Sequence, residues 1–363
     1  MMALLYDLAK VALGNGKELN RSPSVAEWNF VFEEVSNQAI AGVVFEGVQK
    51  LPKEQWPPQD LLFEWIGLAE QIRQQNKEVD KQTAKIWGQL KKDGLDAAIL
   101  KGQGIATLYG ELAPYRQSGD IDIWVKGGYK TVCDYVQSTL PTDDLAYHRF
   151  HYDYFEDTEV ELHHRPTLMR NLLDDRKLAK WYNSFGLDSF VYLEDKGFAV
   201  PSIEFNRIFI LTHIYRHFLF EGIGLRQVMD YYFVLKAQND GRCQMEDVRR
   251  TLRELRLTRF AEAMMWILHT QFGLEKKYLI CGMNEKEGRF VLSEIEQTGN
   301  FGHSDTRYRY QFLLKLRRQI AHGSHLLMHY PSEVLWTPIW LVYHKVWKWS
   351  KKRAIHKMWK IAK

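Results

Sequence analysis

The sequence has few cysteines and no long hydrophobic run. Its three cysteines, Cys133, Cys243 and Cys281, form no CxxC pair and no even-numbered set, so neither a disulfide framework nor a structural zinc site is expected. The longest apolar stretch near the C-terminus, residues 335–343, is about half of the roughly 20 residues that a membrane-spanning helix needs. The first ten residues are too charged, and their apolar run too short, for a secretory signal. We therefore expect a cytoplasmic protein without a transmembrane segment.

The sequence also lacks zinc-hydrolase signatures. It contains no HExxH or HxxEH pattern, and neither His163/His164 nor His213/His217 is joined by a third His or Cys at ligand spacing. For the first pair we expect one buried, hydrogen-bonded histidine and one exposed histidine. The second pair lies at i, i+4 on one helix, where packing is favoured over metal binding. A metal-dependent hydrolase is therefore a distant alternative.

The overall composition is that of an ordinary globular protein with many aromatic residues. Of 363 residues, 45% are hydrophobic and 26% are charged, which fits a protein with a sizeable core. The net charge of +4 gives only weak support for a polyanionic partner.

Residues 1–93 have the pattern of a helical segment. Ser24 is a suitable N-cap for a helix over residues 24–48. After a Pro-Pro pair, apolar residues recur with a helical period over residues 61–90, which predicts one long amphipathic helix. Two lysines followed by Gly94 mark its C-terminal end.

Residues 94–200 mix strands with helices. Short apolar runs alternate with helical patterns, and glycines or polar residues separate them. The expected elements are a strand at 96–100, a helix at 104–109, a strand at 120–125, a helix at 129–140, a hairpin at 147–155 and 158–164, and a second hairpin at 190–200. This pattern predicts a small mixed β-sheet core.

The chain after Pro201 is helical again. Candidate helices cover residues 203–219, 225–237, 245–272, 285–297 and 307–329, and Pro331 and Pro338 punctuate the remainder. The predicted fold class is α+β. The predicted domains are an N-terminal helical segment at 1–93, an α/β core at 94–200 and a C-terminal helical domain at 201–363.

Two aspartates, Asp120 and Asp122, lie in the strand expected at 120–125. Because successive strand side chains point to opposite faces, the two carboxylates share one face while Ile121 and Ile123 point into a core. Neighbouring carboxylates repel each other, and a divalent cation relieves this repulsion by taking the hard oxygen ligands that it prefers. The pattern therefore indicates metal-assisted phosphoryl or nucleotidyl transfer.

A third carboxylate comes from the strand expected at 158–164. Glu159, Glu161 and His163 share one face of this strand. If that strand lies beside the two aspartates, Glu161 is the best candidate for a third metal ligand, and Glu159 is its rival. Two-metal sites use such carboxylates to position the attacking oxygen.

The order of these features resembles the DNA polymerase beta-like nucleotidyltransferase superfamily. The matching residues are Leu100-Lys-Gly102 at a strand end, then a helix, Arg116, Asp120-Ile-Asp122, and the strand Glu161-Leu-His163. Within the superfamily, the chain looks like the uncharacterised bacterial nucleotidyltransferase family often called NTP-transferase type five. The segment 116–122 also resembles the abortive-infection nucleotidyltransferases of toxin–antitoxin systems.

The resemblance implies a nucleotidyltransferase-like core and roles for the matching residues. Asp120 and Asp122 would ligate Mg²⁺ (or Mn²⁺), and Glu161 would complete the site as a third ligand or as the base that deprotonates the acceptor. The implied nucleotide-binding positions are Lys101, Gly102, Gln103, Gly104, Arg116 and Ser118. The glycines would let backbone amides approach a triphosphate at the following helix start, and Lys101 and Arg116 would neutralise phosphate charge.

The loop departs from the superfamily pattern at Gln103, because the serine hydroxyl that usually contacts phosphate is missing. Two interpretations follow. In the first, the Gln103 amide replaces that hydroxyl, and the protein transfers a nucleoside monophosphate from an NTP to a hydroxyl acceptor with release of pyrophosphate. In the second, the protein is a degenerate nucleotide-binding or regulatory protein that binds NTP without turnover.

A third interpretation rests on the end of the chain, where five tryptophans mix with lysine and arginine. Such a helix suits a nucleic-acid-interacting, antitoxin-like module or a membrane surface. The stripe formed by Trp336, Trp340 and Trp347 is more typical of packing against the helical domain, which would leave a solvated basic tail. Nucleotidyl transfer is the favoured function.

Two arginines also have structural interpretations. Arg116 is a potential ion-pair partner of Asp120 or Asp122, which would keep those carboxylates ionised. Arg226 and Asp230 lie at i, i+4, which predicts a salt bridge on a helix surface.

Overall fold

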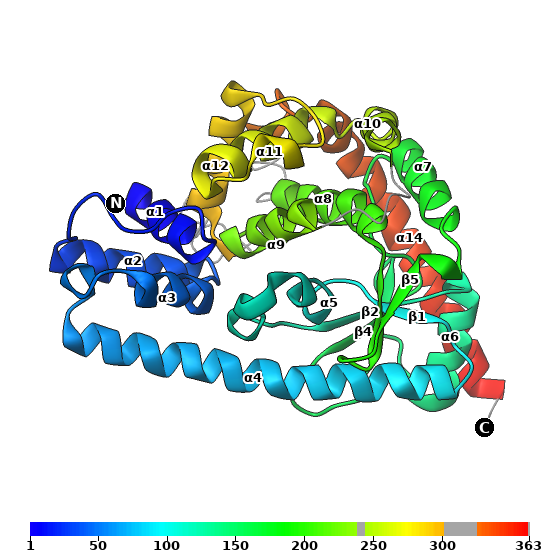
Figure 1. The fold of residues 1–363 in the computed structure, drawn as a ribbon. Coiled ribbons are helices and arrows are strands. Elements are labelled where there is room, and N and C mark those ends of the chain that lie inside the picture. Colours follow the sequence, from blue (N-terminus) through cyan, green and yellow to red (C-terminus); the bar gives the residue numbers. More distant parts are fainter. Residues whose placement is uncertain (238–243, 301–324, 362–363) are drawn as a thin grey trace, which may run out of the picture. The chain divides into compact units, whose positions relative to one another are not determined.

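The structure, a computed structural model, describes residues 1–237, 244–300 and 325–361. The chain packs as two compact units, each assembled from three separated stretches of sequence. The first unit comprises residues 1–78, 105–118 and 220–313, and the second comprises residues 79–104, 119–219 and 314–363. All the described β-strands belong to the second unit (Figure 1).

The first unit is built from helices. Its described elements are α1 (Met2–Ala12), α2 (Val25–Asn37), α3 (Ala41–Lys50), the 3-10 helices η1 (Lys53–Gln55), η2 (Thr107–Tyr115) and η4 (Lys276–Tyr278), α9 (Leu225–Lys236), α10 (Met245–Glu254), α11 (Thr258–Phe272) and α12 (Glu285–Thr298). The first part of α4 (Gln59–Lys92) also belongs to it. The helical character predicted for these stretches is confirmed, except that η4 and most of η2 were not predicted.

Two helices that the sequence pattern predicts as continuous are broken. Ser24 caps α2 as predicted, in a reciprocal capping box. The helix predicted over 24–48 divides into α2 and α3 at Ala39, and the helix predicted over 245–272 divides into α10 and α11 at Arg256. These two residues have φ angles of 57° and 58°. A left-handed residue interrupts the helical hydrogen bonds and costs about 1–2 kcal/mol, a cost that apolar periodicity does not reveal.

The second unit contains a four-stranded mixed sheet in the order β1-β2-β4-β3. Its strands are β1 (Ala97–Ile99), β2 (Ile121–Val125), β3 (Arg149–His151) and β4 (Val160–His163). Strand β2 pairs antiparallel with β1 and parallel with β4, and β3 pairs antiparallel with β4. A separate hairpin joins β5 (Phe190–Leu193) to β6 (Phe198–Pro201). The strands, both hairpins and the α+β class are as predicted.

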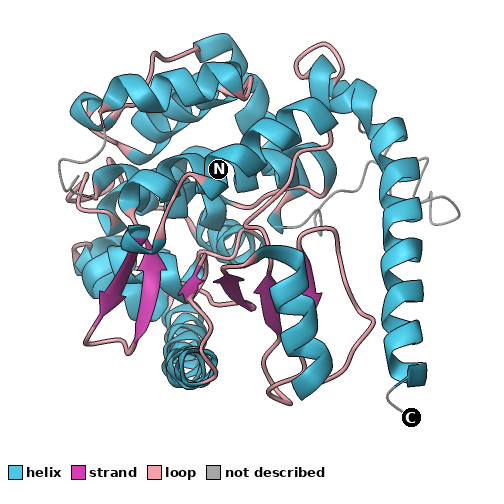
Figure 2. Cartoon of the chain, turned by 90° about the vertical axis from the view of Figure 1, so that its right-hand side faces the viewer, coloured by secondary structure: helices cyan, strands magenta, loops and turns pink. Residues whose placement is uncertain are grey.

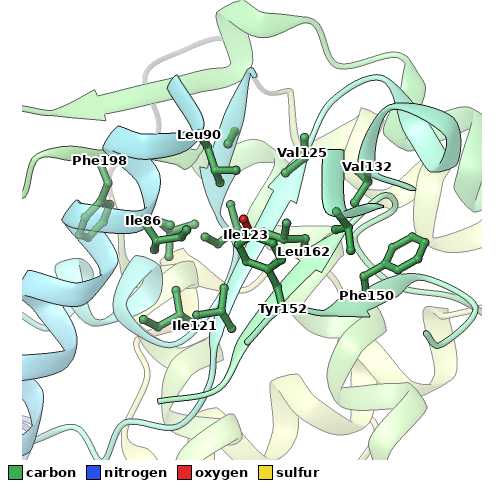
Figure 3. Packing of buried hydrophobic residues seen from close by; sticks show 14 of the residues in the cluster. Ile86, Leu90, Ile121, Ile123, Val125, Val132, Phe150, Tyr152, Leu162 and Phe198 are labelled. Atoms are coloured by element: carbon green, nitrogen blue, oxygen red, sulfur yellow. The ribbon is translucent and has the colours of Figure 1, made fainter. Parts of the chain in front are cut away.

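One face of the sheet is buried in a hydrophobic core (Figure 3). The inward residues of β2 and β4 are almost fully buried, with Ile123 and Leu162 both at 0% exposure. They pack with Ile86 and Leu90 of α4 and with Val132 of α6 (Gly128–Thr139). Because strand side chains alternate, this packing directs the polar residues of β2 and β4 to the opposite face.

The remaining described helices of the second unit are α7 (Leu172–Asn183), the 3-10 helix η3 (Leu187–Ser189), α8 (Ile203–Phe220) and α14 (Pro331–Ile361). The short α5 (Gln103–Ala106) begins in this unit after β1 and ends in the first unit. The sequence pattern did not predict α7. Its start has clear local signals, because Asn171 caps it and two acidic residues occupy its first turn. Its few apolar residues explain why periodicity missed it.

The C-terminal helix α14 runs as one long helix (Figure 2). Pro331 occupies its first position, where a missing N–H is tolerated. Pro338 lies inside the helix, so it does not interrupt the chain there as the sequence pattern indicated. Ile355 is 1% exposed, and Trp347 packs against the sheet core. The tryptophans therefore have a packing role as predicted, but Trp347 packs against the sheet core and not against the helical domain. The helix predicted over 307–329 lies mostly outside the described residues.

Among the described helices, none is both long enough and apolar enough to cross a membrane.

Candidate functional site

Two pairs of acidic side chains meet on the face of β2 and β4 that lies opposite the hydrophobic core. Asp122 of β2 lies directly opposite Glu161 of β4 in the parallel register. Asp120 immediately precedes β2, and Glu159 immediately precedes β4. The metal-ligating atoms of Asp122, Glu161 and His163 lie within 4.8 Å of one another, and so do those of Asp120, Glu159 and Glu161. Glu161 belongs to both groups.

Asp122 is buried and has two cationic or donor partners. Its Oδ1 accepts from Lys101 Nζ at 3.0 Å and from His163 Nε2 at 2.8 Å. Burial alone would raise the pKa of Asp122, but the Lys101 ammonium and His163 outweigh it and hold that pKa below its ordinary range. Asp122 is therefore an ionised carboxylate inside the protein, as a metal ligand must be.

Glu161 is buried too, and it forms an ion pair with Arg149 of the neighbouring strand β3. Its Oε2 also lies 3.3 Å from His163 Nε2. Two cationic side chains thus balance the two buried carboxylates, Lys101 beside Asp122 and Arg149 beside Glu161. Sequence reasoning missed Arg149, although its place in the hairpin opposite Glu161 and His163 is a signal that could have found it.

Asp120 is more accessible to solvent than Asp122. Partial burial and the neighbouring Asp122 carboxylate both raise the pKa of Asp120, while Lys101 opposes them. Lys101 and Arg149 thus offset only part of the effect of burial and of the Asp122 carboxylate on Asp120. A divalent cation between these groups would remove the repulsion.

Three buried histidines, His148, His163 and His213, belong to the same unit as the acidic residues. The His148 ring is 5.2 Å from the His163 ring, and its Nε2 pairs with Arg216 at 3.0 Å. Burial, and then nearby cations including Lys101, lowers the pKa values of His148 and His213 well below their ordinary value. These rings are therefore neutral at pH 7. In the described residues, neither metal-ligating group includes His213, which agrees with the packing interpretation.

The glycine loop after β1 is held by close backbone contacts. Gly102 has a φ of 55°, a conformation that suits glycine. A Cβ on Gly104 would lie 2.5 Å from the backbone oxygen of Ile99, so no larger residue fits there. The Gln103 amide, 4% exposed, donates to Asp80 of α4, which also pairs with Lys196.

Arg116 and Ser118 belong to the first unit, and the structure gives Arg116 a different partner from those expected. Its Nε and Nη2 bind the two carboxylate oxygens of Asp230 at 2.7 and 2.8 Å, and the Tyr109 hydroxyl also donates to Asp230. Asp230 is 5% exposed, so the surface salt bridge expected at Arg226 and Asp230 is wrong. Burial would lower the pKa of Arg116, but Asp230 outweighs it and raises that pKa.

The sequence was then compared with known proteins. The model of a family described as an uncharacterised nucleotidyltransferase matches residues 24–273. This range includes both acidic pairs, the glycine loop and the Arg116–Asp230 pair. Comparison with curated proteins and with solved structures gave no match. Because the family model covers well over half of the chain, the protein belongs to this uncharacterised nucleotidyltransferase family.

Proposed function

We propose that the protein is a metal-dependent nucleotidyltransferase that moves a nucleoside monophosphate from an NTP to a hydroxyl acceptor and releases pyrophosphate. The observation that carries the proposal is the register of β2 and β4, which places Asp122 opposite Glu161 with Asp120 beside them. Membership of a nucleotidyltransferase family supports the general reaction.

The donor chemistry of the site fits a hard divalent cation. Asp120 and Asp122 each have a carboxylate oxygen within 4.8 Å of one from Glu161. Mg²⁺ and Mn²⁺ prefer such oxygen ligands. These three residues would hold the metal. When bound, it would neutralise charge on the triphosphate and on the reacting oxygens.

The chain's own residues have distinct roles in this proposal. The acceptor oxygen forms a bond to the α-phosphorus, the bond from that phosphorus to the β-phosphate bridging oxygen breaks, and pyrophosphate leaves. The acceptor proton passes to a site carboxylate, for which Glu161 is the proposed base. Lys101 would turn from Asp122 to a phosphate oxygen, because a bound cation takes over its charge-balancing role.

The degenerate alternative also has a specific observation in its favour. The Gln103 amide is engaged by Asp80, so it does not replace the missing serine hydroxyl unless that bond is broken. Gln103 therefore anchors the glycine loop to α4, and phosphate contacts fall to the backbone amides and Lys101. This alternative predicts NTP binding without product formation.

The first test needs no knowledge of the acceptor. Thermal unfolding is measured with each of four NTPs, in Mg²⁺, Mn²⁺ or EDTA, for the wild type and for the variant Asp120→Asn/Asp122→Asn. Ligand binding to the folded state raises the midpoint by mass action. A metal-dependent shift with one NTP that the variant loses supports the site, and the matched surface variant Asp134→Asn should keep it.

A second step separates the enzyme from its degenerate alternative. The NTP identified by the shift is supplied with an α-phosphate label, and label transfer to small molecules or macromolecules of a cell extract is followed. Metal-dependent transfer that the double variant loses supports turnover. A shift without any transfer supports the degenerate protein, and no shift with any NTP contradicts both.

A further inference from the structure

A second candidate binding site lies at the carboxyl ends of the parallel strands β2 and β4. It is a cavity of about 260 Å³, close to the lower end of the range of ligand pockets in proteins. We call it the aromatic pocket, because five aromatic side chains line it: Trp124, Tyr129, Tyr147, Tyr182 and Trp347. All its lining residues belong to the second unit. Its size suits one small molecule.

The pocket is positively charged. Lys351 of α14 and Arg165 after β4 line it, and among the described residues no aspartate or glutamate does. The Lys351 ammonium lies 4.2 Å from the centre of the Tyr129 ring. Arg165 binds Asp175 at 2.7 Å through Nη2 and lies over the Tyr147 ring. Because Asp175 neutralises Arg165, the net positive charge of the pocket comes from Lys351.

The start of α6 opens into the same cavity. Gly127 and Gly128 have φ angles of 98° and 74°, and α6 has neither a capping side chain nor an acidic residue in its first turn. Gly128 lines the pocket, and a Cβ added there would meet no described atom within 4 Å. A ligand oxygen can thus approach the first N–H groups of the helix, where the helix dipole favours negative charge.

The pocket adjoins the acidic residues through the strands themselves. Trp124 follows Asp122 by two residues on the same face of β2, and His164 directly follows His163. Two residues along a strand span about 7 Å. The Trp124 wall of the pocket therefore lies about 7 Å along β2 from Asp122.

We propose that the aromatic pocket binds the acceptor of the reaction, a small molecule that carries a phosphate group on a ring. The phosphate binds Lys351 and the start of α6, and the ring stacks on the aromatic walls. This assignment rests on the proposed function and makes it more specific, because it selects a small phosphorylated acceptor over a protein or a nucleic acid.

The test measures binding directly by calorimetry in EDTA, with the full chain. The probes are inorganic phosphate, glucose 1-phosphate, cytidine monophosphate, glucose and cytidine. A ring-bearing phosphate should bind at least tenfold more tightly than inorganic phosphate and than its own uncharged counterpart. The two phosphorylated probes distinguish a sugar ring from a nucleobase. If no probe binds, or if charge makes no difference, the assignment is overturned.

Matched variants locate the binding. Lys351→Met keeps the aliphatic stem and removes the charge, and affinity should fall at least fivefold. Lys357→Met removes the same charge from an exposed position of α14 and should bind as the wild type does. Gly128→Asp and Gly128→Asn are similar in size and both tolerate a positive φ, so only the aspartate should repel the phosphate. Equal affinities across each pair overturn the site.

The outcome is independent of the metal-site test. The variant Asp120→Asn/Asp122→Asn should keep phosphate-probe binding, whereas Lys351→Met should keep the metal-dependent NTP shift. If an NTP competes with the probes in EDTA, the pocket is part of the donor site, and the acceptor assignment is overturned.

Discussion

Replacing Asp230 with asparagine leaves the Arg116 guanidinium buried without a counter-charge. The two side chains are 5% and 7% exposed and share two hydrogen bonds of 2.7 and 2.8 Å. Breaking a buried ion pair by removing one partner costs about 3–5 kcal/mol. The asparagine oxygen can still accept one bond from Arg116 or Tyr109, so we expect a loss near 3 kcal/mol. This is a large share of the roughly 5–15 kcal/mol that stabilises an ordinary domain.

Urea unfolding at pH 7 measures this loss, with the double variant Arg116→Met/Asp230→Leu as its companion. Because the double variant removes both charges, it should be more stable than Asp230→Asn. NTP affinity of the folded Asp230→Asn protein should equal that of the wild type if the Arg116 guanidinium, which Asp230 binds through Nε and Nη2, has a structural role. A stability loss below about 1 kcal/mol, or altered NTP affinity, refutes the reasoning.

Three further predictions follow from single contacts. Burial raises the pKa of Glu333 from 4.5 to about 7, so between these pH values the folded state keeps a proton that the unfolded state has released. The free energy of unfolding should therefore fall by about 3 kcal/mol as the pH rises from below 4.5 through 7. Urea unfolding of Glu333→Gln should not show this pH dependence. Gly104→Ala should lower the free energy of unfolding by about 1–3 kcal/mol through overpacking against the preceding strand. Gly88→Ala, whose added Cβ meets no described atom within 4 Å, should raise the thermal midpoint. Equal midpoints for the two variants would contradict both expectations. Gln103→Met should lower the free energy of unfolding by about 1–3 kcal/mol, because the hydrogen bond to Asp80 is lost. The variant should keep the NTP-induced thermal shift. Loss of that shift would mean that Gln103 contacts the nucleotide.

Local sequence patterns were sufficient to predict features that depend on a single strand or helix. The alternation in β2 fixes which side Asp122 faces, since Ile121 and Ile123 must be buried. The same alternation places Glu161 and His163 together on β4. Helix α4 was equally clear, because its apolar period runs unbroken to its C-terminal glycine. The family resemblance, confirmed by the match over residues 24–273, rests on these local motifs.

Partners that are distant in sequence were not predictable in the same way. Asp230 lies 114 residues after Arg116, and Asp80 lies 23 residues before Gln103 on another element. No period or motif encodes such pairs, because they depend on how separate elements pack. The same holds for Arg149, which reaches Glu161 only through the pairing of β3 with β4.

The sequence by itself determined the α+β class, most helices and strands, the family, and the shared face of Asp120 and Asp122, because each depends on local periodicity or on a contiguous motif. Tertiary structure decided the strand register that sets Glu161 opposite Asp122, the salt-bridge partners of Lys101 and Arg116, and the aromatic pocket. The physical reason is that burial and charge pairing depend on distances across the fold. Those distances are fixed only when the elements pack together.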